Sequence, residues 1–394
     1  MRLPAGFVAS GVRSGVRKSR PDLALVVCEK GAAAAALFTR NRFPAAPVVL
    51  SRAALRASGG RVDAVVVNAG CANAITGRPG TDAARRVRRR AAELLHCPPE
   101  RVFLASTGVI GVVLPDARVR AALPAAVARL SPAGLDAASH AILTTDVGPK
   151  VAAATFRAGA RRGRVVGFAK GAGMIHPDMA TMLAFILTDA PASPGFLKAA
   201  LRRAADESFH AISVDGDTST NDTVLLLASG QLGAPPLEEG GPVAAEFERA
   251  LTAVCRELAW RIVRDGEGAT RVMEVTIEGA ASLREARLAA HAVATSPLVK
   301  TALHGGDPNW GRILAAVGRS GARVAPGRAR LAVAGLCLVE RGTPAAYRER
   351  DAAKLFARER VPITVHLGAG SASARVLSSD LGHDYVSLNA DYRS

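Results

Sequence analysis

A threonine, Thr181, lies between a glycine-rich, turn-like segment and the apolar run of residues 182–187. A threonine hydroxyl is a poor nucleophile because it is essentially un-ionised at neutral pH, and it needs an adjacent base. If the peptide bond after Ala180 were cut, Thr181 would gain a free α-amino group with a pKa of about 8 beside its own hydroxyl. These residue types therefore predict a nucleophile that carries its own base.

The threonine could make such a cut itself. Thr181 would attack the Ala180 carbonyl and form an ester by an N-to-O acyl shift, and water would then release an N-terminal threonine. The small side chain of Ala180 leaves room for the attack, and Pro177 with the nearby glycines would hold the peptide in a strained turn. A Ser-His-Asp triad is not indicated, because nothing marks a carboxylate partner for His176, five residues from Thr181.

A strand-like segment leads into ASTGVIG, residues 105–111. Glycine lets the backbone turn its N–H outward, and the hydroxyl of Thr107 beside Gly108 adds a second donor, so the pair has the groups of an oxyanion hole. A tight turn with a helix cap explains the same residues, and such caps are common. From this motif alone, the structural turn is the preferred interpretation.

Three further loops are rich in polar side chains: LTTDVGPK (143–150), VDGDTSTNDTV (214–224) and RDGEGATR (264–271). The second lacks the spacing and the final glutamate of an EF-hand, which favours a hydrogen-bonded turn network over a calcium site. In the third loop, Glu267 either lies in a solvated turn or presents its carboxylate to a cationic ligand. Lys170 completes neither a P-loop nor a dinucleotide-binding motif, but a loop could bring it to Thr181.

The apolar pattern predicts the elements that hold these loops. Strands and helices alternate with glycine-rich turns, which indicates an α/β or α+β fold built in layers. We expect a catalytic layered domain of residues 1–280 and a smaller α/β domain of residues 281–394, with alternating strands and loops after its first helix. The strand-like segments are 23–28, 62–67, 102–105, 151–156, 165–168, 182–187, 224–228 and 272–277, and the helical ones are 81–95, 196–208, 243–264 and 281–292.

The formal net charge is +17, and a basic balance can indicate nucleic-acid binding. Much of the charge is arginine on amphipathic helical patterns such as residues 83–95. Aromatic residues make up only 4 % of the chain and no RNA- or DNA-binding motif is present, so base-stacking groups are scarce. Nucleic-acid binding is therefore not expected as the main function.

The five cysteines are scattered without a C-x-x-C pair, and the eight histidines form no H-E-x-x-H pattern. These patterns favour a reducing cytosol and predict neither a metal nor a bound cofactor. No stretch reaches the roughly 18 apolar residues of a membrane helix, so we expect a soluble, cytoplasmic protein without a membrane partner. The basic segment 1–20 lacks the apolar centre of a secretory signal and is interpreted as part of the mature fold.

The segment KGAGMIHPDMATMLAFILTDA, residues 170–190, closely resembles the self-cleavage region of the ornithine acetyltransferase family, also called the glutamate N-acetyltransferase or bifunctional arginine-biosynthesis protein family. The resemblance runs nearly end to end, and collinear motifs are far more specific than any single one. It implies a layered α/β/β/α sandwich that resembles the self-cleaving β-aminopeptidase and N-terminal-nucleophile folds. The other motifs are FTRNRFPAAPV, VVNAGCANAITG, ASTGVIG, LTTDVGPK, VDGDTSTNDTV, VRDGEGATR, SPLVKTALHGGDPNWGRILAAVGRSG and DYVSLNADYRS.

The resemblance also implies an activity in arginine biosynthesis. Cleavage between Ala180 and Thr181 would give an α chain (1–180) and a β chain (181–394), in an assembly of two α and two β chains. Thr181 would take the acetyl group from N2-acetyl-L-ornithine and pass it to L-glutamate in a ping-pong cycle. Whether acetyl-CoA is a second donor, which would add amino-acid N-acetyltransferase activity, stays open.

Individual residues gain implied roles. Thr107 and Gly108 would form the oxyanion hole, which reverses the interpretation from the motif alone. Lys170 can pair with a substrate carboxylate and Glu267 with an ammonium, so charge would orient an amino-acid-like ligand at both ends. Two implied contacts lie at the end of the chain, whose tail would have to fold back into the site. The positions that match substrate contacts in the family are Thr144, Lys170, Thr181, Glu267, Asn389 and Ser394.

The sequence departs from the family pattern at a few positions. Cys71 and Ile75 stand where asparagine and cysteine are expected, Asp178 replaces asparagine, and Val147 lies in a loop that usually reads T-x-P-K. Ser394 replaces threonine but keeps the hydroxyl. None of these is the nucleophile or an oxyanion residue, so they bear on substrate preference and rate more than on the class of reaction.

A self-cleaving aminopeptidase or amidase is the alternative function. The family resembles the β-aminopeptidases in fold, and water can replace glutamate as the acyl acceptor. Lys170, Glu267 and the tail suit amino-acid substrates and favour the transferase.

Overall fold

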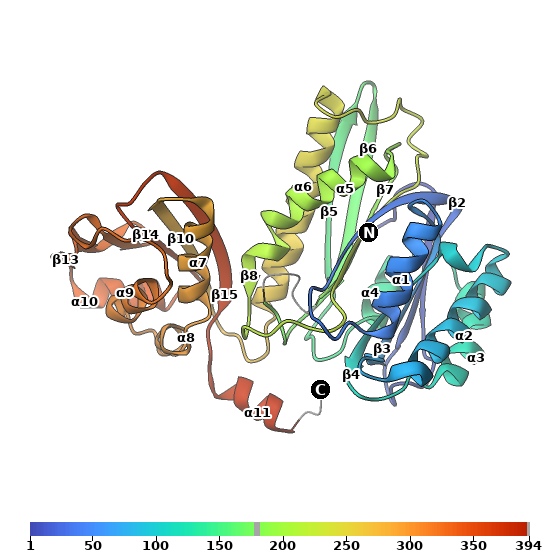
Figure 1. Ribbon diagram of the computed structural model, residues 1–394, viewed down its shortest axis with the longest axis horizontal. Helices are drawn as coiled ribbons and strands as arrows, with labels where there is room; N and C mark the ends of the chain where they lie inside the picture. Colours follow the sequence, from blue (N-terminus) through green and yellow to red (C-terminus); the bar gives the residue numbers. More distant parts are fainter. Residues whose placement is uncertain (177–181, 392–394) are drawn as a thin grey trace.

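The computed structural model describes residues 1–176 and 182–391, and two β-sheets organise them (Figure 1). In the first sheet the strands run in the order β4-β3-β2-β9-β7-β6-β5, and β1 pairs with β2. The inner pair β7 and β9 is parallel, as is the pair β3 and β4. The strands of this sheet are β1 (Phe7–Val12), β2 (Leu23–Phe38), β3 (Arg61–Cys71), β4 (Val102–Val109), β5 (Lys150–Ala158), β6 (Arg161–Lys170), β7 (Leu183–Thr188) and β9 (Thr223–Ala228).

The first sheet forms two layers, and the long strand β2 runs from one layer into the other. Its register against β3 shifts between Val27 and Ala32, so the strand is irregular at its middle. The layer that contains β4 packs face to face on the layer that contains β7. The evidence is a shared apolar cluster, in which Phe103 lies with Phe168 and Phe185.

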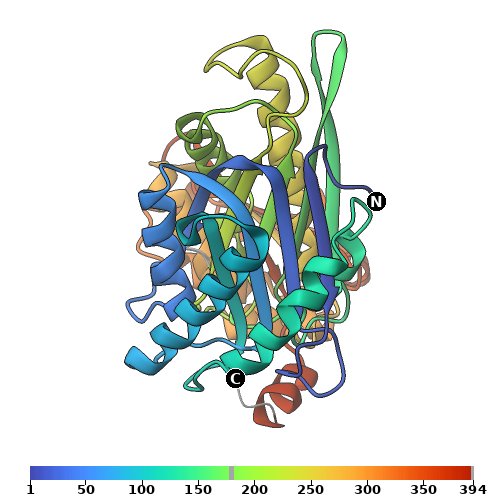
Figure 2. The same ribbon diagram turned by 90° about the vertical axis from the view of Figure 1, so that its right-hand side faces the viewer.

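Helices cover the two outer faces. Helices α1 (Ala46–Ala57), α2 (Gly77–Leu95) and α3 (Asp116–Ala128) bury their apolar sides on one, and α5 (Pro194–Asp206) and α6 (Pro242–Arg264) on the other. Figure 2 looks onto these layers from one side, with blue and cyan helices in front of the strands. The predicted layered α/β/β/α sandwich is confirmed.

A second sheet has its own core and the strand order β13-β12-β11-β14-β10-β15-β8. Its strand β10 (Val272–Ala280) precedes the expected boundary at residue 280, and its short strand β8 (Ile212–Ser213) comes from between two strands of the first sheet. The division into domains at residue 280 stays a prediction. The remaining strands are β11 (Arg330–Val333), β12 (Leu336–Glu340), β13 (Thr343–Pro344), β14 (Arg360–His366) and β15 (Ala372–Ser379).

Every segment predicted as a strand overlaps a strand, and the predicted helices differ from the observed ones by a few residues at their ends. The prediction of only strands and loops after residue 292 is wrong, because short helices occur there. Ser296 and Asn309 cap two of them by accepting backbone N–H groups, but so few turns give little periodic signal. The helices outside the outer layers are α4 (Leu135–Ala141), α7 (Leu283–Ala294), α8 (Pro297–Gly305), α9 (Trp310–Gly318), α10 (Glu349–Phe356) and α11 (His383–Asp391).

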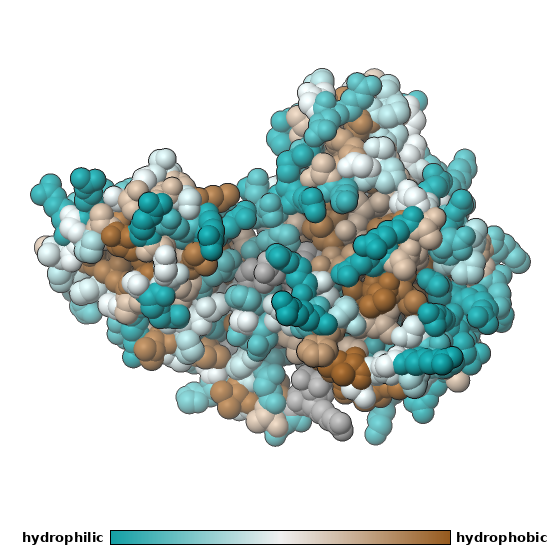
Figure 3. Space-filling view, viewed as in Figure 1, coloured by the Kyte–Doolittle hydropathy of each residue, from teal (hydrophilic) through white to brown (hydrophobic). Residues whose placement is uncertain are grey.

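After the second sheet, the chain runs through helix α11 back toward the ends of β3 and β4 (Figure 1). Its backbone lies on the loop at Gly268, where an added Cβ would be 2.5 Å from the Tyr385 nitrogen, so a glycine is needed for this approach. Val386 and Leu388 are 63 % and 49 % exposed, and apolar area is visible over this helix in Figure 3. In the described part of the chain, no helix has the length and apolar character of a membrane span.

Candidate active site

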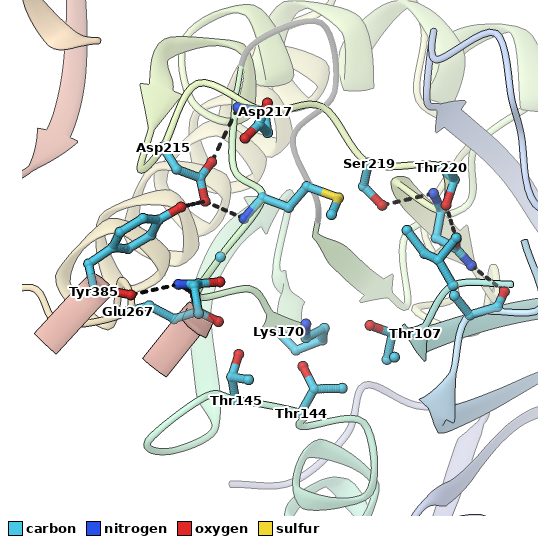
Figure 4. Close-up of a pocket in the computed structure, with 17 residues that line it drawn as sticks. Thr107, Thr144, Thr145, Lys170, Asp215, Asp217, Ser219, Thr220, Glu267 and Tyr385 are labelled. Atoms are coloured by element: carbon cyan, nitrogen blue, oxygen red, sulfur yellow. Dashed lines mark hydrogen bonds between the residues drawn. The ribbon is translucent and has the colours of Figure 1, made fainter. Parts of the chain in front are cut away.

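A cavity of about 210 Å³ lies where β4 and β6 end, and it brings together most of the predicted site residues (Figure 4). A cavity of this size suits a small ligand, since sites for drug-sized molecules are larger. Thr181 and Ser394, and the cleavage partner Ala180, lie outside the described residues. The predicted residues that line the cavity are Thr107, Gly108, Thr144, Lys170, Glu267 and Asn389. Their convergence is observed, whereas their individual roles stay predictions.

Thr107 and Gly108 stand at a strand end that close backbone packing holds rigid. Gly108 has a φ of 129° and faces Gly70 across the parallel pair, so an added Cβ would be only 2.3 Å from the Gly70 carbonyl carbon. Only glycine fits this position. Asn221 fastens the strand end to the loop 214–224, because its Nδ2 donates to the carbonyl oxygens of Ala72 and Ser106 at 2.8 Å each.

Lys170, the last residue of β6, belongs to a buried cluster of charges. Lys170 and Asp146 are almost fully buried, with relative exposures of 3 % and 2 % for the whole residues. Asp146 Oδ2 lies 3.7 Å from Lys170 Nζ, and Asp146 Oδ1 lies 2.6 Å from Lys150 Nζ. Asp146 therefore stands between two lysines in an environment where an unpaired charge would be costly.

Asp146 also fixes the backbone on both sides of the pocket. Its Oδ1 accepts the Gly171 N–H at 2.7 Å, next to Lys170, and its Oδ2 accepts the Thr144 N–H at 3.0 Å. Lys150 donates in turn to Asp265 at the end of α6. One carboxylate thus connects two loops that carry predicted substrate contacts.

Burial and charge oppose each other in this cluster. Burial works against ionisation of Asp146, but the charges of Lys170 and Lys150 outweigh it and hold the pKa of Asp146 below its usual range. Burial is also the largest influence on Lys170 and lowers the pKa of its ammonium group, although Asp146 opposes the shift. The cluster stays favourable only while its opposite charges are close together.

Glu267 forms the opposite wall of the cavity together with α11. Its N–H donates to the Ala172 carbonyl at 3.0 Å, and its carboxylate packs so close to Gly173 that an added Cβ there would be 2.5 Å from Oε2. Asn389 Nδ2 donates to Glu267 Oε2 at 2.9 Å. Figure 4 shows Lys170 between Thr107 on one side and Glu267 on the other. The tail does fold back to the pocket as far as Asn389.

Asp215 anchors the segment that precedes residue 177. It accepts the N–H groups of Met174 and Ile175, the latter at 2.8 Å, and the Tyr385 hydroxyl donates to it at 3.4 Å. Met174 has a φ of 58°, an uncommon left-handed conformation for a non-glycine residue. Burial raises the pKa of both Asp215 and Tyr385. His176, at the end of this segment, lies against Ser213 and is not among the residues that line the cavity.

Sequence reasoning marked the loops of Asp146 and Asp215 as polar but assigned these residues no role, and it did not single out Tyr385. The available signal for Asp146 was Lys150 four residues later. Among the residues that depart from the family pattern, Val147 and Ile75 are 90 % and 63 % exposed. Cys71 is buried, and Asp178 and Ser394 lie outside the described residues. Within 1–176 and 182–391, no group of three His, Cys, Asp or Glu side chains is arranged to hold a metal ion.

The site combines a buried cation, a carboxylate across a small cavity, and a strand end with hydroxyl and N–H donors. Such an arrangement can orient a ligand that carries both a carboxylate and an ammonium group. Fold and site together define an α/β/β/α sandwich protein with a charged pocket at the ends of its inner strands.

Comparison with known proteins identifies the family. The model of the ArgJ family matches residues 8–394. Curated relatives named arginine biosynthesis bifunctional protein ArgJ include those of Symbiobacterium thermophilum, 48 % identical over 99 % of this chain and 98 % of the relative, and Thermus thermophilus, 48 % identical over 100 % and 99 %. The chain belongs to the ArgJ family of arginine-biosynthesis enzymes, which confirms the family predicted from the sequence.

A solved structure supports the fold. The crystal structure of the arginine biosynthesis bifunctional protein ArgJ from Bacillus halodurans is 40 % identical, with a TM-score of 0.52. The alignment covers 53 % of this chain and 98 % of that chain. The solved chain is therefore about half as long as this one.

Proposed function

We propose that the protein transfers the acetyl group of N2-acetyl-L-ornithine to L-glutamate through an acetyl ester on Thr181. The observation that carries this proposal is the pocket itself, where a buried lysine and a carboxylate face each other across a small cavity next to Thr107 and Gly108. Both amino acids carry a carboxylate, and Lys170 is the cation that would bind it. Glu267 would bind the side-chain ammonium of the ornithine group.

The transfer has two balanced halves. Thr181 Oγ1 attacks the acetyl carbonyl carbon, the amide C–N bond breaks, and the proton from the hydroxyl passes through the α-amino group to the leaving nitrogen of ornithine. The amino group of glutamate then attacks the ester carbonyl carbon, the ester C–O bond breaks, and a proton from the attacking nitrogen passes through the α-amino group to Thr181 Oγ1, which restores the hydroxyl. In both halves Thr107 and Gly108 would stabilise the negative oxygen of the tetrahedral intermediate.

The free α-amino group would come from self-cleavage between Ala180 and Thr181. The hydroxyl attacks the Ala180 carbonyl, the peptide C–N bond breaks as the ester forms, and water hydrolyses the ester. The length of the solved Bacillus halodurans chain supports this proposal, because residues 181–394 are likewise just over half of the present chain. The two products would assemble as two α and two β chains in the cytoplasm.

Denaturing electrophoresis and a transfer assay test the proposal together. Wild-type protein should run as two fragments, and Thr181→Ala should run as one chain without transferase activity. Thr188→Ala, at the last residue of β7, is the control and should be cut normally. An intact wild-type protein with full activity would refute the role of the free amine.

The assay also separates transfer from hydrolysis. Radiolabelled N2-acetylornithine should yield labelled acetylglutamate when glutamate is added. Release of acetate at a rate that glutamate does not change would instead support the amidase alternative. Replacing acetylornithine with acetyl-CoA then tests whether this chain has the second donor activity that would make it bifunctional.

A further inference from the structure

A groove of about 460 Å³ lies between helices α1 and α5, away from the candidate active site. Its floor is the second half of β2, and its sides are the end of α1 with the following turn and the start of α5. The described residues that line it fall within 34–38, 52–60 and 194–198, and none of them lines the cavity of the candidate active site. This β2 groove is therefore a second concave surface that the proposed acetyl transfer does not use.

The floor of the β2 groove is an open edge of the first sheet. The pairing of β2 with β3 ends at Ala33, and the Gly60 carbonyl then accepts the Ala34 N–H at 2.7 Å. Beyond this point, β9 is the only strand in the described part of the chain that pairs with β2. Alternate residues of a strand direct their N–H and C=O groups to the same side, so those of Ala36 and Phe38 point away from β9, as the Ala34 N–H does. The groove thus offers backbone donors and acceptors where a further strand, in line with β3, would lie.

The sides of the β2 groove carry positive charge. Arg52 and Arg56 come from α1 and Lys198 comes from α5, and no acidic side chain is among the described residues that line the groove. Arg52 is held over one end, because its guanidinium carbon lies 5.3 Å from the centroid of the Phe38 ring and its Nη2 donates to the Thr39 carbonyl at 3.3 Å. None of the three cations forms an ion pair within residues 1–176 and 182–391. Their charge is therefore available to a negatively charged partner.

We propose that the β2 groove binds an extended, acidic peptide segment of a partner protein, which adds a strand to the open edge of β2. The peptide backbone pairs with Ala36 and Phe38, and its carboxylates face the cations of α1 and α5. Residues 34–38 span about 13 Å at roughly 3.3 Å per residue, so four or five residues of the peptide would pair. This binding is independent of the proposed cleavage and acetyl transfer.

The combination of an open edge and positive charge favours an acidic peptide over other occupants. A second copy that paired through the same edge would bring Arg52, Arg56 and Lys198 against identical cations, which is unfavourable. A single-stranded nucleic acid binds through phosphates and stacked bases, and the one aromatic ring among the described lining residues, Phe38, is already covered by Arg52. A small anion would satisfy the charges and leave the edge unpaired. An acidic peptide uses both features.

Fluorescence anisotropy with the purified full chain tests the proposal. The probe is a fluorescein-labelled peptide of the sequence Glu-Glu-Val-Glu-Glu, which has carboxylates on both faces of a strand. The same peptide methylated on the backbone nitrogens of its three central residues keeps the charge but cannot donate to β2 from either edge. We expect this methylation to weaken binding at least about tenfold, and the peptide Lys-Lys-Val-Lys-Lys should not bind. Inorganic phosphate and a ten-nucleotide strand of thymidines serve as competitors.

Substitutions separate the charges from the edge. Arg56→Gln with Lys198→Gln removes two exposed cations of the groove, and Kd for the acidic peptide should rise about tenfold, since one exposed charge changes affinity only a few-fold. Arg89→Gln with Arg202→Gln removes the same charge from exposed positions outside the groove and should leave Kd within about twofold of wild type. Ala36→Pro removes an edge N–H that faces away from β9, so the pairing with β9 is kept while binding should weaken at least about tenfold. Thermal unfolding shows whether each variant is folded, and the methylated peptide tests the same backbone pairing on the wild-type chain.

Each alternative predicts a different result. Equal binding of the methylated and unmethylated peptides, or full displacement by phosphate, would show that charge alone is recognised and would reject strand addition. Tighter binding of the thymidine strand than of the acidic peptide would assign the groove to nucleic acid and reject the proposal. A change of oligomeric state in the variant without Arg56 and Lys198, measured by size-exclusion chromatography, would assign the groove to a second copy. If the acidic peptide does not bind at all, the cations only protect the open edge from pairing, and the proposal is wrong.

Discussion

The two walls of the pocket are built in opposite ways. The inner wall consists of the ends of β4 and β6 and of the buried cluster of Asp146, Lys150 and Lys170. The outer wall includes α11, whose described residues are exposed apart from the half-buried Tyr385. Side-chain hydrogen bonds to Asp215 and to Glu267, rather than a buried apolar face, connect this helix to the pocket.

A binding site must hold some groups in a fixed geometry and must also contact its ligand, and the two walls differ in which of these requirements they meet. Groups that must hold a fixed geometry are placed on strands and surrounded by packed side chains, where a small displacement is resisted. The α11 wall has little buried area and should contribute to ligand contact much more than to stability. Changes in the inner wall should therefore affect folding and chemistry, and changes in α11 should affect binding alone.

The largest effect is expected from Asp146→Asn. The substitution leaves two buried lysines without their shared negative charge, so the free energy of unfolding should fall by about 3 kcal/mol. Urea unfolding at pH 7 measures it. Asp136→Asn, whose side chain is 85 % exposed, is the control and should change stability by less than about 0.5 kcal/mol. A loss below about 1 kcal/mol for Asp146→Asn would contradict the view that this cluster holds the inner wall.

Lys170→Met should separate binding from stability within the same wall. Methionine retains much of the shape, and Asp146 still has Lys150, so stability should change less than in Asp146→Asn. The substrate carboxylate loses its cation, and kcat/KM for acetylornithine should fall about 100-fold, mainly through KM. Lys198→Met, an exposed lysine on α5, should leave kcat/KM unchanged. An unaltered KM in Lys170→Met would show that the carboxylate binds elsewhere.

The pH dependence of stability gives a smaller and more specific signature. The pKa of Asp146 is lower in the folded protein than the usual value of about 4. The contribution of this carboxylate to the free energy of unfolding is therefore complete above about pH 4 and is lost as the pH falls toward the folded pKa. The difference in unfolding free energy between wild type and Asp146→Asn should therefore be largest at neutral pH and narrow below about pH 4. Urea unfolding at several pH values measures it. A difference that is constant down to pH 3 would assign the loss to packing instead of charge.

The same contrast explains what could be predicted from sequence. The strands β4 and β6, whose ends form the inner wall, contain the short apolar runs 102–105 and 165–168, and this pattern reports burial directly. Helix α11 buries little apolar surface, so it lacks the periodic signal by which helices are recognised, and it was not predicted. Composition and pattern thus reveal elements that are stabilised by the core and miss those held by single polar contacts.

The residues of the site also differ in whether they could be predicted from the sequence. Lys170, Glu267 and Thr107 stand in motifs of the sequence, and the resemblance to the family implied their roles in the site. Asp146 and Asp215 contact residues distant in the chain, Lys170 and Met174 among them, and such distances are set only by the fold. Supporting carboxylates of this kind are therefore found only once the strands are assembled.

The smallest effects are expected from α11. Asn389→Ala removes a hydrogen bond to Glu267 at an exposed position, so unfolding free energy should change by less than about 0.5 kcal/mol, while KM for acetylornithine should rise about three- to tenfold. Tyr385→Phe, which loses the contact with Asp215, should behave similarly. Ser387→Ala is the control on the same helix, since its hydroxyl bonds only within the helix among the described residues. If Asn389→Ala destabilised the protein as much as Asp146→Asn, α11 would be part of the packed structure and the contrast between the two walls would be wrong.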